Sequence, residues 1–128
     1  ISTHVPEVIM RAEEEDWGLD FYMACVHNLR KYNRYQSSFI TGKTLNHTFY
    51  KEDRQEMFNV IKKIEKPCIA FKILSGGHLA VTSEAMENAF KETYENIKPS
   101  DVAVVGVFQK YKDQLKENAE ILSKVLNI

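Results

Sequence analysis

The chain has 128 residues, of which 44% are hydrophobic and 27% are charged. This length suits one domain, 1–128, with a core of its own. The net charge of −1 excludes the strongly basic surface that nucleic-acid binding requires. No apolar run approaches the roughly 20 residues that cross a bilayer, and no segment resembles a signal peptide. We therefore expect a cytoplasmic protein whose partners are neither nucleic acids nor membranes.

Strand-like and helical segments alternate along the chain. The first residues, ISTH, resemble the end of a strand, and the helix after them can begin at Pro6 and end at Gly18. Further strands are expected in three apolar runs, 19–28, 68–74 and 102–108. Further helices are expected where apolar residues recur at helical spacing, over 51–65, 84–97 and 113–126. The intervening residues 29–49 are polar and lack a clear period, as in a long connection.

The helical spacing also predicts which side chains face the core. They are Val8, Ile9, Ala12 and Trp17, then Met57, Ile61 and Ile64, then Met86, Phe90, Tyr94 and Ile97, and finally Leu115, Ala119, Leu122 and Val125. Thr82 or Ser83 can cap the third of these helices. Cys25 and Cys68 lie in apolar runs, so we expect two reduced, buried thiols instead of a disulfide or a metal pair.

The regular alternation of strand and helix predicts parallel strands joined by right-handed crossovers. Four βα units fit the chain, and the first lacks most of its strand. A complete (β/α)8 barrel takes about 250 residues, so the expected fold is α/β, the C-terminal half of a TIM-type barrel. Since open edges and interior side chains would otherwise face water, we expect a fragment of a longer chain, or pairing with a missing or second half-barrel.

Polar residues follow three of the expected strands. His4 ends the first and His27 ends the second, while Lys72 lies late in the third, before the turn SGG. In a barrel the carboxyl ends of the strands form the mouth of the site, so these three side chains should converge there. Two interpretations stay open for each residue, since Lys72 can contact a ligand or extend past the strand into water, and the histidines can be functional or structural.

The stretches KPCIAFKILSGGHLAVTSEAMENAF and DVAVVGVFQKYKDQLKENAEIL resemble the C-terminal part of aldo-keto reductase-like barrels. ISTH stands where that family has its fifth strand, and LDFYMACVHN stands where it has its sixth. The resemblance covers nearly the whole chain except the connection 29–49, and it is closest to uncharacterised members. It implies an oxidoreductase that uses NADP or NAD on a small-molecule substrate, with the catalytic residues in the first four βα units, outside this chain.

The resemblance also implies a set of cofactor-binding positions in this chain. Ser2 and His4 match the segment that holds the nicotinamide amide, and Glu117 and Asn118 match the pair that meets the adenine. Ser75, Gly76 and Gly77, just after Lys72, match the loop along the pyrophosphate. Gln114 stands where the family often has an arginine, and Lys110 or Lys112 could take over the contact with a 2′-phosphate.

Two other functional classes are compatible with the sequence. Histidines at the ends of successive strands, His4 and His27, suit a zinc-dependent hydrolase or lyase. Against this alternative, the last strand ends in Val107 and Phe108 with no carboxylate, and Asp101 lies at the opposite end of that strand. The third class is a barrel that binds or supports without catalysing.

Overall fold

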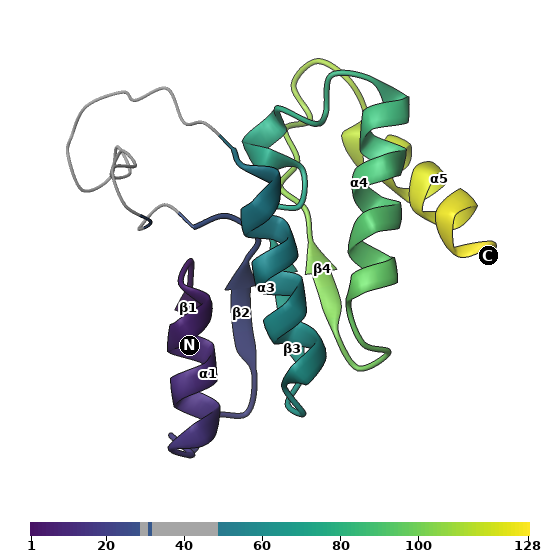
Figure 1. The fold of residues 1–128 in the computed structure, drawn as a ribbon. Coiled ribbons are helices and arrows are strands. Elements are labelled where there is room, and N and C mark those ends of the chain that lie inside the picture. Colours follow the sequence, from purple (N-terminus) through teal and green to yellow (C-terminus); the bar gives the residue numbers. More distant parts are fainter. Residues whose placement is uncertain (29–30, 32–48) are drawn as a thin grey trace.

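Four parallel strands form a single sheet in the computed structural model, which describes residues 1–28, 31 and 49–128 (Figure 1). The strands are β1 (Ser2–Thr3), β2 (Tyr22–Cys25), β3 (Cys68–Phe71) and β4 (Val102–Val104). They lie side by side in chain order, β1-β2-β3-β4, and every neighbouring pair is parallel. The predicted parallel α/β arrangement is therefore confirmed.

The helices alternate with the strands. They are α1 (Pro6–Glu14), α3 (Lys51–Lys63), α4 (Ser83–Asn96) and α5 (Gln114–Leu126), with a short 3-10 turn η1 (Ser75–Gly77) after β3. Pro6 begins α1 as predicted, and the Thr82 hydroxyl caps α4 by accepting the Ala85 N–H at 3.1 Å. Within the described part of the chain, none of these helices is both long enough and apolar enough to cross a membrane.

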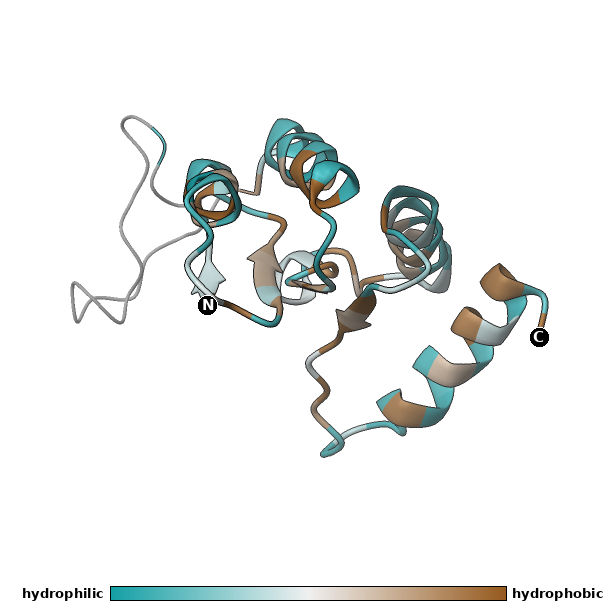
Figure 2. Ribbon diagram, turned by 90° about the horizontal axis from the view of Figure 1, so that it is seen from below, coloured by the Kyte–Doolittle hydropathy of each residue, from teal (hydrophilic) through white to brown (hydrophobic). Residues whose placement is uncertain are grey.

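The four long helices that the structure describes lie along one side of the sheet (Figure 2). The residues on that side of β2 and β3, such as Tyr22, Ala24 and Ala70, are fully buried. The register sets Met23, Ile69 and Val102 on the opposite face, and Phe71 and Val104 follow two residues later. Val102 and Val104 are 52% and 47% exposed. Parallel sheets are normally covered on both faces. Here the second face is apolar, and no described helix covers it.

The core lies between the sheet and the helices. Its largest fully buried members are Ile9 of α1, Tyr22 of β2, Met57, Phe58 and Ile61 of α3, and Phe90 of α4. Cys25 and Cys68 are buried and free, as predicted, and burial raises the pKa of both thiols to about 11. They are therefore protonated and unreactive at neutral pH.

Several expectations about boundaries and burial were wrong. The expected strands 19–28, 68–74 and 102–108 are shorter. The strand expected over 68–74 ends at Phe71, because Lys72 adopts a left-handed conformation with φ of +64°. Trp17 lies beyond the end of α1, exposed, and its indole N–H donates to Glu15 at 2.8 Å. Leu115 is 59% exposed, and Ala119 is also exposed, because α5 packs through its second half.

Asp101 joins the amino ends of β3 and β4. These ends lie at the edge of the sheet opposite the strand ends that carry the histidines. Its carboxylate accepts the Cys68 N–H, the Lys98 N–H and the Lys98 ammonium, each at 2.8 Å. The same ammonium donates to the Ile61 carbonyl of α3 at 2.8 Å. One buried carboxylate thus fixes two strands and a helix.

Asp101→Ala should lower the free energy of unfolding by about 3 kcal/mol, because the buried Cys68 N–H, the half-buried Lys98 N–H and the Lys98 ammonium lose their acceptor. Urea unfolding measures this, with Glu120→Ala on the exposed side of α5 as the control, where a change within about 0.5 kcal/mol is expected. A loss at Asp101 no larger than at Glu120 would show that this bonding does not stabilise the fold.

Candidate functional site

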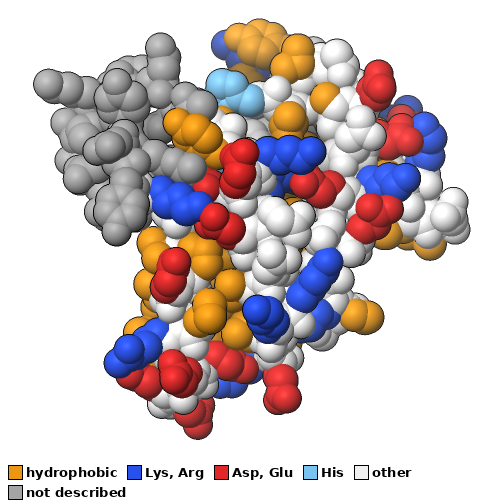
Figure 3. Space-filling view, viewed as in Figure 1, with side chains coloured by type: hydrophobic (Ala, Val, Ile, Leu, Met, Phe, Trp, Pro, Cys, Tyr) orange, Lys and Arg blue, Asp and Glu red, His pale blue; other side chains and the backbone are white. Residues whose placement is uncertain are grey.

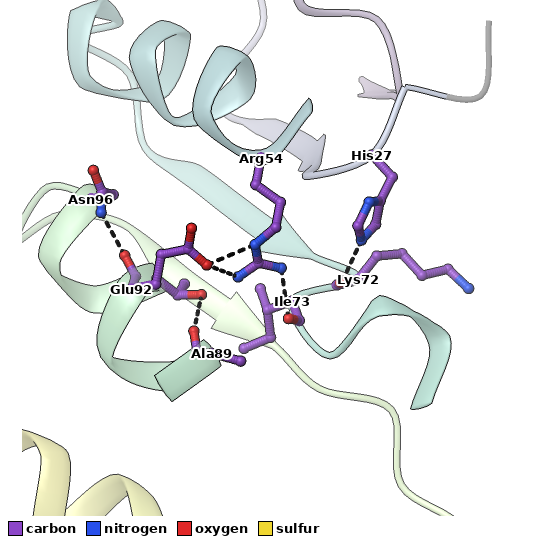
Figure 4. Close-up of polar contacts among 8 residues, drawn as sticks. His27, Arg54, Lys72, Ile73, Ala89, Glu92 and Asn96 are labelled. Atoms are coloured by element: carbon purple, nitrogen blue, oxygen red, sulfur yellow. Dashed lines mark hydrogen bonds and ion pairs between the residues drawn. The ribbon is translucent and has the colours of Figure 1, made fainter. Parts of the chain in front are cut away.

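The carboxyl ends of the first three strands are linked by two histidines. The His4 Nδ1–H donates to the His27 carbonyl at 3.0 Å, and the His27 Nε2–H donates to the Lys72 carbonyl at 3.2 Å (Figure 4). Because a carbonyl oxygen only accepts, His4 Nδ1 and His27 Nε2 must each carry a proton. The three residues that the sequence placed at strand ends therefore meet at one edge of the sheet, through ring-to-backbone bonds.

His27 is the most perturbed titratable group at this edge. It is only 3% exposed, and burial, followed by the nearby charge of Arg54, lowers its pKa to about 4. At neutral pH the ring is uncharged, with its single proton on Nε2. Its Nδ1 is buried and has no hydrogen-bond partner in the described part of the structure. The ring also packs edge-on against Phe49, with 4.4 Å between centroids.

Arg54 is a buried cation at the first turn of α3. Its Nε and Nη2 contact Glu92 of α4 at 2.7 and 2.6 Å, and its Nη1 donates to the Ile73 carbonyl at 2.8 Å (Figure 4). The guanidinium also lies 5.7 Å from the ring centre of Phe58. This single side chain joins α3, α4 and the segment after β3, and sequence reasoning did not identify it. Arg54 and Glu92 are 38 residues apart, so no local pattern pairs them.

The turn after β3 has an unusual backbone. Lys72 and Ser75 have φ values of +64° and +52°, and Gly76 and Gly77 follow at +62° and +99°. Residues with a Cβ rarely adopt such angles, and strained backbone of this kind concentrates at functional sites. With φ at +99°, Gly77 adopts a backbone conformation that residues with a Cβ rarely reach, so this position requires glycine. The turn directs Gly76 and Gly77 to the surface while Ser75 stays buried.

A pocket of about 460 Å³ opens beside this turn. One wall comes from the strand end and turn, including Lys72, Gly76 and Gly77, and another from the end of β4, Val104 to Phe108. Its polar rim comes from the start of α5 and the residues just before it, with Lys112, Gln114, Glu117 and Asn118. Segments more than 40 residues apart thus share one cavity at the carboxyl edge of the sheet, where ligands of open α/β sheets and barrels bind.

Five of the eight cofactor-binding residues expected from the sequence line this pocket: Lys72, Gly76, Gly77, Glu117 and Asn118. Ser75 instead lines a second cavity of about 850 Å³, which also contains His27, Phe49, His78 and Arg54. Ser2 and His4 line neither cavity. His4 has its Nδ1 on the His27 carbonyl, and Ser2 is exposed on β1.

The alternative metal site would use His4 and His27. Each of these rings already donates one N–H to a backbone carbonyl. Over residues 1–28, 31 and 49–128, no three side chains of histidine, cysteine, aspartate or glutamate gather as a metal site would need. The two rings act here as links between strand ends.

Charges of both signs are interspersed over the helical face of the molecule (Figure 3). Lysines and arginines on this face alternate with aspartates and glutamates. One such ion pair, Lys124–Glu87, joins α5 to α4 at 2.6 Å.

Comparison of the chain with protein-family models, with curated proteins and with solved structures finds no match. The site must therefore be interpreted from its own geometry.

Acidification should destabilise the protein through His27. Its pKa is about 4 in the fold and near 6.5 in an unfolded chain, so the unfolded state binds more protons between these values. The free energy of unfolding should be fully retained above pH 6.5 and should fall by roughly 2–3 kcal/mol as the pH drops toward 4.

NMR titration of the His27 ring signals measures this pKa directly. We expect the midpoint at least one pH unit below 6.5, the ordinary value for histidine. A midpoint at or above 6.5 would contradict the buried, neutral state of His27.

Proposed function

We propose that this chain is the cofactor-binding half of an aldo-keto reductase-like (β/α)8 barrel. It holds a nicotinamide dinucleotide, NAD or NADP, in the pocket at the carboxyl edge of its sheet, for an NAD(P)-linked oxidoreductase that acts on a small molecule. The observation that carries the proposal is that one pocket joins the glycine turn after β3 to the start of α5. These are the two segments whose motifs resemble the pyrophosphate and adenine contacts of that family.

The chemistry of the two walls supports a dinucleotide. At the turn, Gly76 and Gly77 carry no side chain, which allows a phosphate to approach the backbone, and Lys72 adds a positive charge. At the other wall, the side-chain amide oxygen (Oδ1) of Asn118 is buried and has no hydrogen-bond partner among the described residues. A buried acceptor of this kind is stabilised by a ligand that brings a donor, such as the amino group of an adenine.

The sheet supports the barrel. Right-handed crossovers between parallel strands added in one direction place every helix on the same face. The helices α1, α3 and α4 follow this rule here and leave Phe71, Val102 and Val104 on a face without a helix (Figure 2). A sheet of this type buries its second face when it closes into a barrel. The missing strands would come from an N-terminal half-barrel or from a second half-barrel.

Asn118→Ala should weaken the binding of NAD+ and NADP+ by about 5- to 30-fold, the scale of one or two kcal/mol for a lost polar contact. Isothermal titration calorimetry on the chain measures it. Asn59→Ala provides the matched control, because Asn59 is exposed on α3 and contacts only Gln55 among the described hydrogen bonds. No saturable binding of either nucleotide, or equal affinity for the wild type and Asn118→Ala, would refute the proposed function.

The chain by itself should associate, because the uncovered sheet face is apolar. Size-exclusion chromatography with light scattering should show dimers or larger species. The double variant Val102→Lys, Val104→Lys should shift them toward monomers, since charges on that face oppose its burial. Lys62→Glu and Lys63→Glu, on the helical side, should leave the association unchanged. A monodisperse wild-type monomer with a cooperative thermal transition would contradict the half-barrel.

A further inference from the structure

The charges around the pocket differ between its two ends. At the turn, Lys72 is exposed and forms no ion pair with any described residue. At the α5 end, the Lys112 ammonium contacts both carboxylate oxygens of Glu117, at 2.9 and 2.6 Å. The first end therefore carries an uncompensated positive charge, whereas at the second end Glu117 already holds the lysine.

The amide groups at the start of α5 are also occupied. The side-chain amide oxygen (Oε1) of Gln109 accepts the Gln114 and Leu115 N–H groups at 2.7 and 3.3 Å, and the Asp113 carboxylate accepts the Lys116 N–H at 3.1 Å. Free N–H groups at a helix start ordinarily attract phosphate. Here the side chains of the preceding loop have already satisfied them, and Asp113 adds a negative charge.

The remaining lysine of this loop lies outside the pocket. Lys110 is exposed, and its ammonium lies 5.3 Å from the ring centre of Tyr111. Lys110 does not line the pocket and Lys112 is paired with Glu117, so this end of the pocket offers no free cation to a 2′-phosphate. Glu117 instead offers carboxylate oxygens, which accept hydrogen bonds from ribose hydroxyls and repel phosphate.

We propose that the pocket selects NAD over NADP through the Lys112–Glu117 ion pair and the capped start of α5. This inference rests on the proposed cofactor-binding function. The pyrophosphate lies at the Lys72 end, and the unphosphorylated ribose lies at the Glu117 end. Selection works by exclusion, because a 2′-phosphate would meet a carboxylate and no free donor.

Calorimetric titration with NAD+ and NADP+ tests this on the wild-type chain and on Glu117→Gln. We expect the wild type to bind NAD+ at least tenfold more tightly than NADP+. Glu117→Gln should shift the affinity ratio at least tenfold toward NADP+, since it removes the repelling charge and releases Lys112. Glu120→Gln provides the matched control on the next turn of α5, where the carboxylate faces Lys116, and should leave the ratio unchanged.

Lys112→Gln gives a second, independent readout. Lys112→Gln leaves the Glu117 carboxylate uncompensated, so NADP+ should bind still more weakly relative to NAD+, and a ratio shifted toward NADP+ would contradict the repulsion by Glu117. Tighter or equal binding of NADP+ by the wild type, or an unchanged ratio in folded Glu117→Gln, would overturn the selectivity while leaving the cofactor site intact. Binding of neither nucleotide would refute the cofactor site itself.

Discussion

The architecture depends on one constraint: parallel strands that follow one another in chain order must return through helices on a single face. This arrangement buries Tyr22, Ala24 and Ala70 beneath the helices and leaves Val102 and Val104 without a described cover. It also places the carboxyl end of every described strand at the same edge of the sheet. The pocket, the two linked histidines and the Arg54–Glu92 pair all lie at or beside that edge, so the site follows from the topology.

Much of this topology could be predicted from the sequence, because its pattern is strong over long segments. The helical spacing of Met57 and Ile61 and of Met86 and Phe90 predicted buried faces that the structure contains. The expectations that failed concerned the ends of strands and helices. Leu115 fits the same helical period, yet it lies at the first turn of α5, beyond the reach of α4. Periodicity predicts which side of a helix is apolar, and it does not predict how much of that side has a neighbour.

The site shows a similar division. The family resemblance implied that Gly76, Gly77, Glu117 and Asn118 belong to the cofactor set, and the structure brings all four to one pocket. Arg54 was not predicted, because its partners come from α4 and from the backbone of Ile73, and pairing over such distances depends on the finished fold. The long connection over 29–49 lies outside the described residues except for Lys31 and Phe49, and the Phe49 ring packs between His27 and His78.

The turn after β3 explains why a lysine interrupts an apolar strand. Left-handed conformations at Lys72 and Ser75 cost on the order of 1–2 kcal/mol each, and the surrounding bonds offset this cost. The Lys72 carbonyl accepts from both the His27 ring and the Ser75 N–H, at 3.2 and 2.8 Å, and the Ser75 carbonyl accepts the His78 N–H at 3.2 Å. A residue held by its backbone in this way does not need its side chain for folding. Lys72 therefore lines the pocket together with Gly76 and Gly77 and keeps its side chain exposed.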